Sequence, residues 1–190
     1  MSPHPTLAGR TVVVITVSDR CAAGTQTDLS GPALTQILAA AGAVILDTLI
    51  LPDELDILIP ALRSASAHAA LVLTTGGTGL APRDVTPEAT LAVCSRLVPG
   101  LAELIRQDGA HHTPYAALGR GVCGVAGSTP GVGPQTLILN LPGNPRGAES
   151  SLRAVLPLLP HALDLLAGNT EHPIESDFDR TEQIAPRTIE

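Results

Sequence analysis

One stretch decides the fold of this chain: Leu71-Val72-Leu73-Thr74-Thr75-Gly76-Gly77-Thr78-Gly79-Leu80-Ala81-Pro82-Arg83-Asp84-Val85-Thr86-Pro87-Glu88. Its apolar start shows no alternation, which is typical of a strand buried on both faces. The glycines that follow lack a Cβ atom, so backbone amides there can approach a ligand closely. Thr86 is predicted as the N-cap of a helix with Pro87 in its first turn. This order of strand, glycine loop and helix predicts an anion-binding site at the carboxyl end of a parallel strand.

Arg83 and Asp84 stand between the glycine loop and the predicted helix. Asp84 is either a turn residue before the helix or a metal-binding or catalytic carboxylate. We favour the second role, because a free carboxylate beside an anion-binding loop is costly unless a cation binds there. Arg83 either pairs with a neighbouring carboxylate or contacts a phosphate, and its position beside the loop favours phosphate. Together the two residues predict a phosphate-bearing ligand and a divalent metal.

The rest of the chain alternates predicted strands and helices, which indicates an α/β fold: a three-layer sandwich with a mostly parallel central sheet. Residues 1–168 are predicted to form one domain, and the polar, acidic segment 169–190 is predicted to be a flexible tail. The predicted strands are 12–17, 43–50, 71–75, 122–125 and 136–141. Helices are predicted from about residue 32, after residue 53, over 87–97, up to residue 106 and from residue 146.

Ligands of such sheets bind over the carboxyl ends of the strands. We therefore expect the loops 18–28, 75–84 and 140–144 to meet, with Asp53 close by because it also follows a strand. Asp53 has an equally good alternative role as a helix cap, since Asp56 three residues later resembles a capping box. Asp28 could likewise be only a turn and helix-start residue.

Composition excludes several classes of protein. The 11 basic residues are all Arg, so Schiff-base chemistry on Lys and a Walker A lysine are excluded. A net charge of −7 and an aromatic content of 1% argue against nucleic acid and anionic membranes as partners. The three cysteines are not spaced as zinc ligands, and no apolar run is long enough to span a bilayer. A cytoplasmic location is therefore expected.

From about Val12 to Leu166 the chain resembles the molybdopterin adenylyltransferase family of the MogA and MoaB type. The resemblance rests on the glycine loop with Arg83-Asp84 and on the motifs Ser18-Asp19, Asp28-Leu29-Ser30-Gly31-Pro32, Pro52-Asp53-Glu54, Thr113-Pro114-Tyr115 and Leu139-Asn140-Leu141-Pro142-Gly143-Asn144-Pro145. It implies Mg²⁺-dependent transfer of AMP from ATP to the terminal phosphate of molybdopterin, with release of pyrophosphate, in molybdenum cofactor biosynthesis. It further implies a homotrimer, or a multiple of one, that hands its product to a molybdate-inserting enzyme. Three alternatives remain: a non-catalytic molybdopterin carrier, the related domain of the molybdate-inserting enzymes, or a nucleotide pyrophosphatase on the same fold.

The resemblance also implies roles for individual residues. The family's two important aspartates match Asp53 and Asp84, which would hold or orient Mg²⁺, and this match favours the site role of Asp53 over the cap. Substrate-binding residues are expected at Ser18, Asp28, Thr75, Gly76, Gly77, Thr78, Gly79, Arg83, Pro142, Gly143 and Asn144. The chain departs from the family by an insert at Pro130–Gln135 and by Gly119, where many members have Ser. Both departures lie towards the region expected to bind the pterin.

Overall fold

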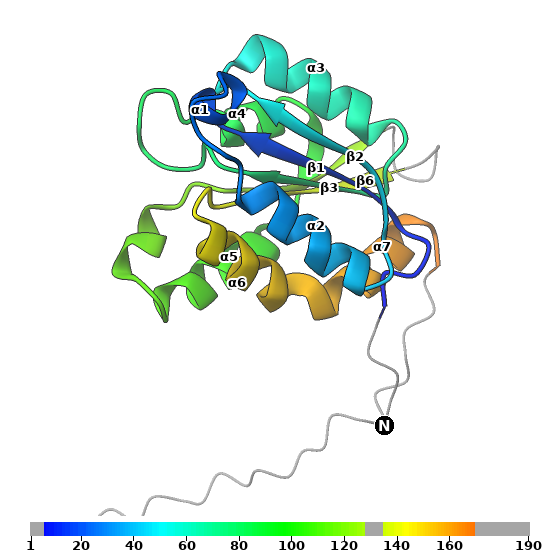
Figure 1. The fold of residues 1–190 in the computed structure, drawn as a ribbon. Coiled ribbons are helices and arrows are strands. Elements are labelled where there is room, and N and C mark those ends of the chain that lie inside the picture. The colour runs from blue at the N-terminus through cyan, green and yellow to red at the C-terminus, as the bar shows by residue number, and fades with distance from the viewer. Residues whose placement is uncertain (1–5, 128–134, 170–190) are drawn as a thin grey trace, which may run out of the picture.

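The computed structural model of the protein describes residues 6–127 and 135–169 and has a six-stranded sheet between two layers of helices (Figure 1). This confirms the three-layer α/β sandwich predicted from the sequence. In chain order the elements are β1 (Thr11–Val17), α1 (Asp19–Ala22), α2 (Ser30–Ala40), β2 (Val44–Leu51), α3 (Leu55–Ser66), β3 (Leu71–Thr75), α4 (Thr86–Leu91), β4 (Cys94–Leu97), α5 (Pro99–Ala110), η1 (Pro114–Leu118), β5 (Cys123–Gly127), β6 (Gln135–Leu141), α6 (Pro145–Val155), η2 (Leu156–Leu158) and α7 (Leu159–Leu166).

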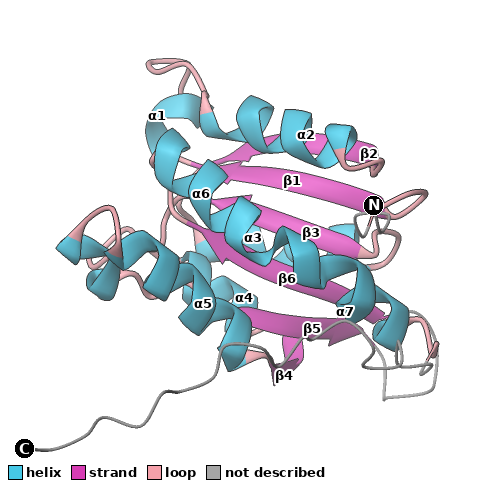
Figure 2. Ribbon diagram, turned by 90° about the horizontal axis from the view of Figure 1, so that it is seen from below, coloured by secondary structure: helices cyan, strands magenta, loops and turns pink. Residues whose placement is uncertain are grey.

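The sheet is mostly parallel, and its strands lie in the order β2-β1-β3-β6-β5-β4 (Figure 2). Strands β2, β1, β3 and β6 pair in parallel, so their carboxyl ends lie at one edge. Strand β5 pairs antiparallel with both β6 and β4, and it therefore begins at that same edge. The chain runs outward from β1 to β2 and then returns to β3. This reversal makes the edge between β1 and β3 the switch point where open α/β sheets bind ligands.

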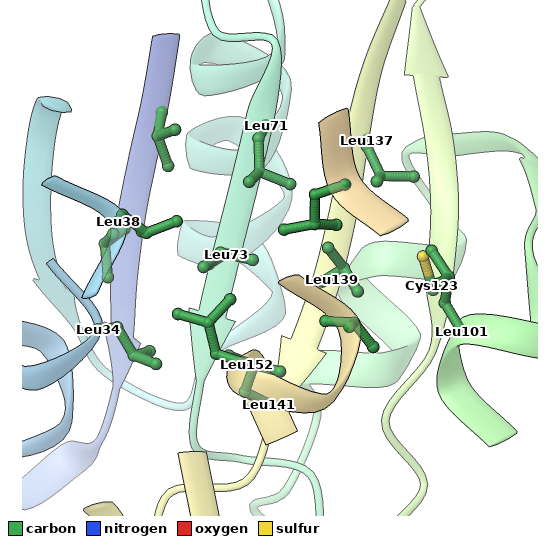
Figure 3. Close-up of a cluster of buried hydrophobic side chains, with 14 of the residues drawn as sticks. Leu34, Leu38, Leu71, Leu73, Leu101, Cys123, Leu137, Leu139, Leu141 and Leu152 are labelled. Carbon is green, nitrogen blue, oxygen red and sulfur yellow. The ribbon is translucent and has the colours of Figure 1, made fainter. Parts of the chain in front are cut away.

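Each face of the sheet packs against its own set of helices. Helices α2, α5, α6 and α7 cover one face through a cluster of leucines that includes Leu34, Leu73, Leu139 and Leu152 (Figure 3). Helices α3 and α4 cover the other face, where Leu58 and other apolar residues meet the opposite side of β1, β3 and β6. The leucine-rich core buries enough apolar surface to hold the sheet rigid, and the strand ends therefore have fixed positions.

Three local expectations were wrong. The helix predicted over 87–97 ends at Leu91, and Cys94–Leu97 is strand β4, which pairs with β5 at the edge of the sheet. The sequence of this segment is compatible with a helix, but pairing with β5 overrides that weak local preference. Thr86 does not cap α4; its hydroxyl donates a 2.9 Å hydrogen bond to the carbonyl of Gly76 and so ties the helix to the glycine loop. Helix α5 continues to Ala110, past the predicted end at residue 106.

Part of the sequence prediction lies outside the described residues. This holds for residues 130–134 of the insert, whose last residue, Gln135, begins β6. It also holds for the tail after residue 169. Within the described ranges, no helix has the length and hydrophobicity needed to cross a membrane.

A buried amide, Asn140 on β6, connects the sheet to the elements around the site. Its Nδ2 donates hydrogen bonds to the hydroxyls of Thr74 at 3.0 Å and Thr90 at 2.9 Å. Its Oδ1 accepts a 3.2 Å hydrogen bond from the amide of Val122. The side chain therefore joins β3, α4 and the segment before β5.

We predict that Asn140→Leu lowers the free energy of unfolding by about 2–4 kcal/mol, because each buried polar group left without a partner costs about 1–3 kcal/mol. Urea unfolding measures this loss. The control is Ile138→Val on the same strand, which removes one methyl group and should cost only about 0.5–1.5 kcal/mol. An Asn140→Leu loss no larger than that of the control would contradict the prediction.

Candidate active site

Two adjoining pockets lie at the carboxyl edge of the sheet. The first, here called the carboxylate pocket, has a volume of about 590 Å³ and is lined by residues 16–21, 26–30, 53, 75–77, 84 and 143–145. The second, here called the helix-side pocket, has a volume of about 980 Å³ and is lined mainly by apolar groups. Its lining residues are 77–80, 84, 102, 105, 106, 109, 112, 113, 115, 116, 118, 119, 121, 140, 142–144, 146, 147, 150 and 151. Both volumes lie in the range of small-molecule sites.

The two pockets share a wall made of Gly77, Asp84, Gly143 and Asn144. Because these residues line both spaces, a group bound in one pocket lies next to a group bound in the other. The wall consists of two glycines, one amide side chain and one carboxylate. This arrangement suits a transfer reaction between two bound molecules.

The glycine loop passes unusually close to the ends of β1 and β6. A Cβ atom on Gly76 would lie 2.2 Å from the carbonyl oxygen of Val17, and the residue has φ +101°. A Cβ atom on Gly143 would lie 3.0 Å from the Cα of Gly76. The hydroxyl of buried Thr75 donates a 2.8 Å hydrogen bond to the carbonyl of Pro142. Side chains at either glycine would therefore separate the three strand ends.

Asp53 does not act as the cap that the sequence left open, since the N-cap of α3 is Glu54. Its Oδ2 accepts a 3.0 Å hydrogen bond from the amide of Asp19, and its own amide donates at 3.1 Å to Asp19 Oδ1. Its other oxygen, Oδ1, is buried and has no hydrogen-bond partner among the described residues. That oxygen lies against Gly77, where a Cβ atom would be only 2.6 Å away. A buried carboxylate oxygen without a donor is costly, and a cation at this position would remove the cost.

The surroundings of Asp53 oppose its ionisation. Burial raises its pKa, the negative charges of Asp19 and Asp84 act in the same direction, and the hydrogen bond from the Asp19 amide acts against them. Arg83 does not line either pocket but forms a two-point ion pair with Asp19, with Nε–Oδ2 at 2.9 Å and Nη2–Oδ1 at 2.7 Å. That hydrogen-bonded pair lowers the pKa of Asp19. Arg83 therefore makes the ion pair that was its alternative role, and Asp19, which sequence reasoning left aside, holds Asp53 in place.

Asp53 and Asp84 fit a magnesium ion that is shared with a substrate. Both side chains line the carboxylate pocket. Asp84 Oδ2 accepts a 2.8 Å hydrogen bond from the amide of Ala81, which fixes the direction of the side chain. In the part of the chain that the structure describes, no group of three or more His, Cys, Asp or Glu residues could hold a metal ion alone. Mg²⁺ characteristically uses one or two carboxylates together with substrate phosphates, so two aspartates suffice.

The structure brings together twelve of the thirteen predicted site residues, Arg83 being the exception. Both pockets are lined by the four residues of the shared wall, 77, 84, 143 and 144. Only the carboxylate pocket is lined by Ser18, Asp28, Asp53, Thr75 and Gly76. Only the helix-side pocket is lined by Thr78, Gly79 and Pro142.

Asp28 precedes α2 and binds its first amides, which is the turn and helix-start role that the sequence analysis gave as its alternative. Its Oδ1 accepts hydrogen bonds from the amides of Ser30 and Gly31, both at 3.0 Å. Its Oδ2 accepts a 2.6 Å hydrogen bond from the hydroxyl of Thr16. Both carboxylate oxygens therefore accept hydrogen bonds, and the carboxylate holds the start of α2 against β1. Asp28 also lines the carboxylate pocket.

Several polar residues in or beside the helix-side pocket were not among the predicted site residues. Arg106 donates a 3.1 Å hydrogen bond to the carbonyl of Gly121. The hydroxyl of Ser150 donates at 2.5 Å to Asp108 and lies 3.1 Å from Nε2 of His112. Tyr115, the one tyrosine of the chain, lies at the pocket with 76% of its surface exposed. Except for His112, which lies in the turn after α5, these residues come from α5, α6 and η1. The packing of these elements against one another brings the residues together, and it cannot be predicted from local sequence alone.

The fold and the two pockets define a small-molecule-binding α/β protein with its site at the switch point of the sheet. Residues 13–161 match the family described as a probable molybdopterin binding domain. The chain belongs to that family, because the match covers most of its length.

Individual relatives agree with this assignment. The molybdopterin adenylyltransferase of Helicobacter pylori J99 is 38% identical over 163 residues, which are 82% of this chain and 87% of the relative. The molybdenum cofactor synthesis protein cinnamon of Drosophila melanogaster is 41% identical over 157 residues, but this chain spans only about a quarter (25%) of its length. The molybdopterin biosynthesis enzyme MoaB of Thermus thermophilus superposes with a TM-score of 0.75 at 48% identity, covering 84% of this chain and 97% of that one.

We predict that Asp53→Asn raises the melting temperature of the metal-free protein near neutral pH. The folded-state pKa of Asp53 is raised above the ordinary value of 3.8, so its charged form opposes folding. This opposition is absent well below pH 3.8 and develops as the pH rises through the folded-state pKa. The gain should therefore vanish in acid, and partial exposure keeps it to a few degrees at most. Thermal melts at about pH 7 and about pH 3 measure both limits.

Thermal melts of the same two proteins with added ligand provide a control. Mg²⁺ with ATP should raise the melting temperature of the wild-type protein by mass action and should leave that of Asp53→Asn nearly unchanged. Equal stabilisation of both proteins would show that Asp53 is not a metal ligand.

Proposed function

We propose that the protein is a molybdopterin adenylyltransferase: with Mg²⁺ it transfers AMP from ATP to the terminal phosphate of molybdopterin and releases pyrophosphate. The proposal places this reaction in molybdenum cofactor biosynthesis. The relatives that bear this name support it, as does membership of the molybdopterin-binding family. The observation that carries it is the shared wall, where Asp84 lies between two pockets that can each hold one substrate.

Each substrate has a pocket whose chemistry suits it. The carboxylate pocket contains Asp53, Asp84 and the backbone of the glycine loop, which suits a triphosphate with its metal ion. The helix-side pocket is larger and mostly apolar, which suits a flat pterin ring system. Arg106 and Arg146 also line it and supply positive charge for the terminal phosphate of the pterin.

The proposed reaction requires positioning more than covalent chemistry. An oxygen of the pterin's terminal phosphate attacks the α-phosphorus of ATP, a new P–O bond forms, and the bond between the α-phosphorus and the bridging oxygen to the β-phosphate breaks. The loop amides of residues 77–79 and Ser18 would hold the phosphates of the two substrates, and Asp53 and Asp84 would hold Mg²⁺. When bound there, the ion would supply positive charge to the triphosphate and to the departing pyrophosphate. The shared wall keeps both phosphates in line and excludes water from between them.

Incubation with Mg-ATP and molybdopterin tests the proposal against the pyrophosphatase and carrier alternatives. Adenylylated pterin and pyrophosphate in equal amounts support the transferase. ATP hydrolysis without transfer would indicate a nucleotide pyrophosphatase. Binding of the pterin without any turnover would indicate a carrier, for which the two aspartates would have no use.

We predict that Asp84→Ala lowers kcat by about 100-fold or more, because the electrostatic stabilisation of a developing charge at such a site is worth that much. The fold should survive, since the side chain lies in an exposed loop rather than in the core. The control is Asp47→Ala, which removes an exposed carboxylate from β2, away from both pockets. Steady-state pyrophosphate release and thermal melts measure both variants, and a lower melting temperature with unchanged kcat would contradict the prediction.

Cys21 provides a test of where the nucleotide binds. It lines the carboxylate pocket, whereas burial raises the pKa of Cys94 to about 11 and of Cys123 to about 12 and keeps both thiols unreactive. We predict that a thiol reagent at about pH 8 modifies Cys21 first and that Mg-ATP slows this reaction. Peptide mass spectrometry follows each site, and unchanged labelling of Cys21 at saturating ATP would exclude the nucleotide from this pocket.

Assembly and location form the last part of the proposal. The exposed edge strand β2 carries Val44, Leu46 and Ile50 on its surface, and unprotected apolar edges favour association. We infer a homotrimer or a multiple of one, which light scattering during size-exclusion chromatography tests. The three cysteines are free thiols, which fits the reducing cytoplasm. The product would pass to a molybdate-inserting enzyme.

A further inference from the structure

Arg120 lies between η1 and β5, lines neither pocket, and contacts the loop that carries Asp84. Its Nε donates a 2.6 Å hydrogen bond to the carbonyl of Gly79, and its Nη2 donates at 2.6 Å to the carbonyl of Asp84. Its Nη1 pairs with Glu88 on α4, and its backbone amide donates at 2.9 Å to the carbonyl of Thr78. All three guanidinium nitrogens therefore hold the glycine loop and the helix that follows it.

The loop depends on these bonds because it has few others. Its internal hydrogen bonds join only Ala81 and Asp84, through the amide of each residue. Leu80 at its tip is 63% exposed and contributes little packing. Within the described residues, the hydrogen bonds that leave residues 79–84 go to Arg120 or, from Arg83, to Asp19. Arg120 fixes both ends of the loop, at Gly79 and at Asp84.

We propose that Arg120 is a positioning residue that sets the place of the Asp84 carboxylate. The inference rests on the proposed function, since it takes Asp84 as a ligand of Mg²⁺. Asp19 orients the Asp53 carboxylate and is itself bound by Arg83. Asp84 belongs to a loop that Arg120 binds at both ends. Two arginines outside the pockets thus fix the distance between two carboxylates that repel each other. A planar guanidinium donates to the two carbonyls and the carboxylate from three separate nitrogens, whereas an ammonium group carries all its donors on one nitrogen.

The same arginine ties Asp84 to the wall of the helix-side pocket. Gly119 and Gly121 flank it and line that pocket. A Cβ atom on Gly121 would lie 2.9 Å from the carbonyl oxygen of Asn140, so the backbone on this side rests directly on β6. The loop therefore takes its position from the rigid sheet through Arg120.

The test compares Arg120→Lys with Arg96→Lys. Arg96 is an exposed arginine on β4 whose side chain donates a hydrogen bond to Gln135. Like Arg120, Arg96 lines neither pocket. Arg120→Lys should lower kcat by about 10- to 100-fold, the cost of a displacement of about 1 Å in a catalytic group. It should also raise the Mg²⁺ concentration needed for half-maximal rate, while KM for ATP changes less than about threefold. Arg96→Lys should change none of these. Hydrogen exchange of the amides in residues 79–84 should accelerate only in Arg120→Lys.

A second variant separates positioning from general stability. Glu88→Gln removes the ion pair but leaves both carbonyl contacts of Arg120 in place, so its kcat, expressed per folded molecule, should stay within about threefold of wild type. A fall as large as that of Arg120→Lys would overturn the proposal, and so would an Arg120→Lys enzyme with unchanged kcat and Mg²⁺ dependence. Absence of AMP transfer by the wild-type protein would refute the proposed function instead. The hydrogen-exchange comparison would then still decide whether Arg120 holds the loop.

Discussion

Close backbone contact between the ends of β1, β3 and β6 is the constraint on which the site depends. Gly76 lies so near the carbonyl of Val17 that a Cβ atom would be 2.2 Å away, and a Cβ atom on Gly143 would lie 3.0 Å from the Cα of Gly76. The loops that follow these strands consequently form one wall between two pockets. A larger residue at either glycine would push the loops apart, and substrates bound on the two sides would then no longer meet. The leucine core keeps the sheet rigid, and the lack of side chains at Gly76 and Gly143 lets the loops approach one another.

This arrangement places negative charges together, and ion pairs only partly compensate for them. Asp53 carries a buried oxygen without a donor, and burial raises its pKa. Arg83 compensates Asp19 rather than Asp53, and so it fixes the geometry without neutralising the carboxylate that faces the pocket. Such uncompensated charge opposes folding, and proteins keep it where a ligand completes the site. A carboxylate that served only to cap α3 would not carry this penalty.

The parts of the fold and site that were predictable follow from local chemistry. Apolar runs and the glycine loop identified β1, β3 and β6, and the rule that ligands bind at the carboxyl ends of parallel strands brought Asp53 and Asp84 together. Strand β4 was missed because its structure comes from pairing with β5 at the sheet edge, which its own sequence does not encode. Arg120 was missed because it precedes an antiparallel strand, whose beginning, not its end, lies at the site. The sequence left open whether Arg83 forms an ion pair or contacts a phosphate. Its partner Asp19 follows a different strand, and the position of Arg83 beside the glycine loop does not show which carboxylate will contact it.

The two-carboxylate centre also bears on how a metal would reach the protein. The described residues offer no third His, Cys, Asp or Glu near enough to complete a metal site. A hard cation such as Mg²⁺ keeps most of its ligands from water or phosphate in that situation, so its affinity for the free protein is low. In the proposed reaction the triphosphate would supply the missing oxygens, and metal and nucleotide would bind together. Binding of the nucleotide would then relieve the repulsion between Asp53 and Asp84 in the same step that forms the catalytic centre. The charge that destabilises the free protein would then be a source of selectivity for a metal-bound triphosphate.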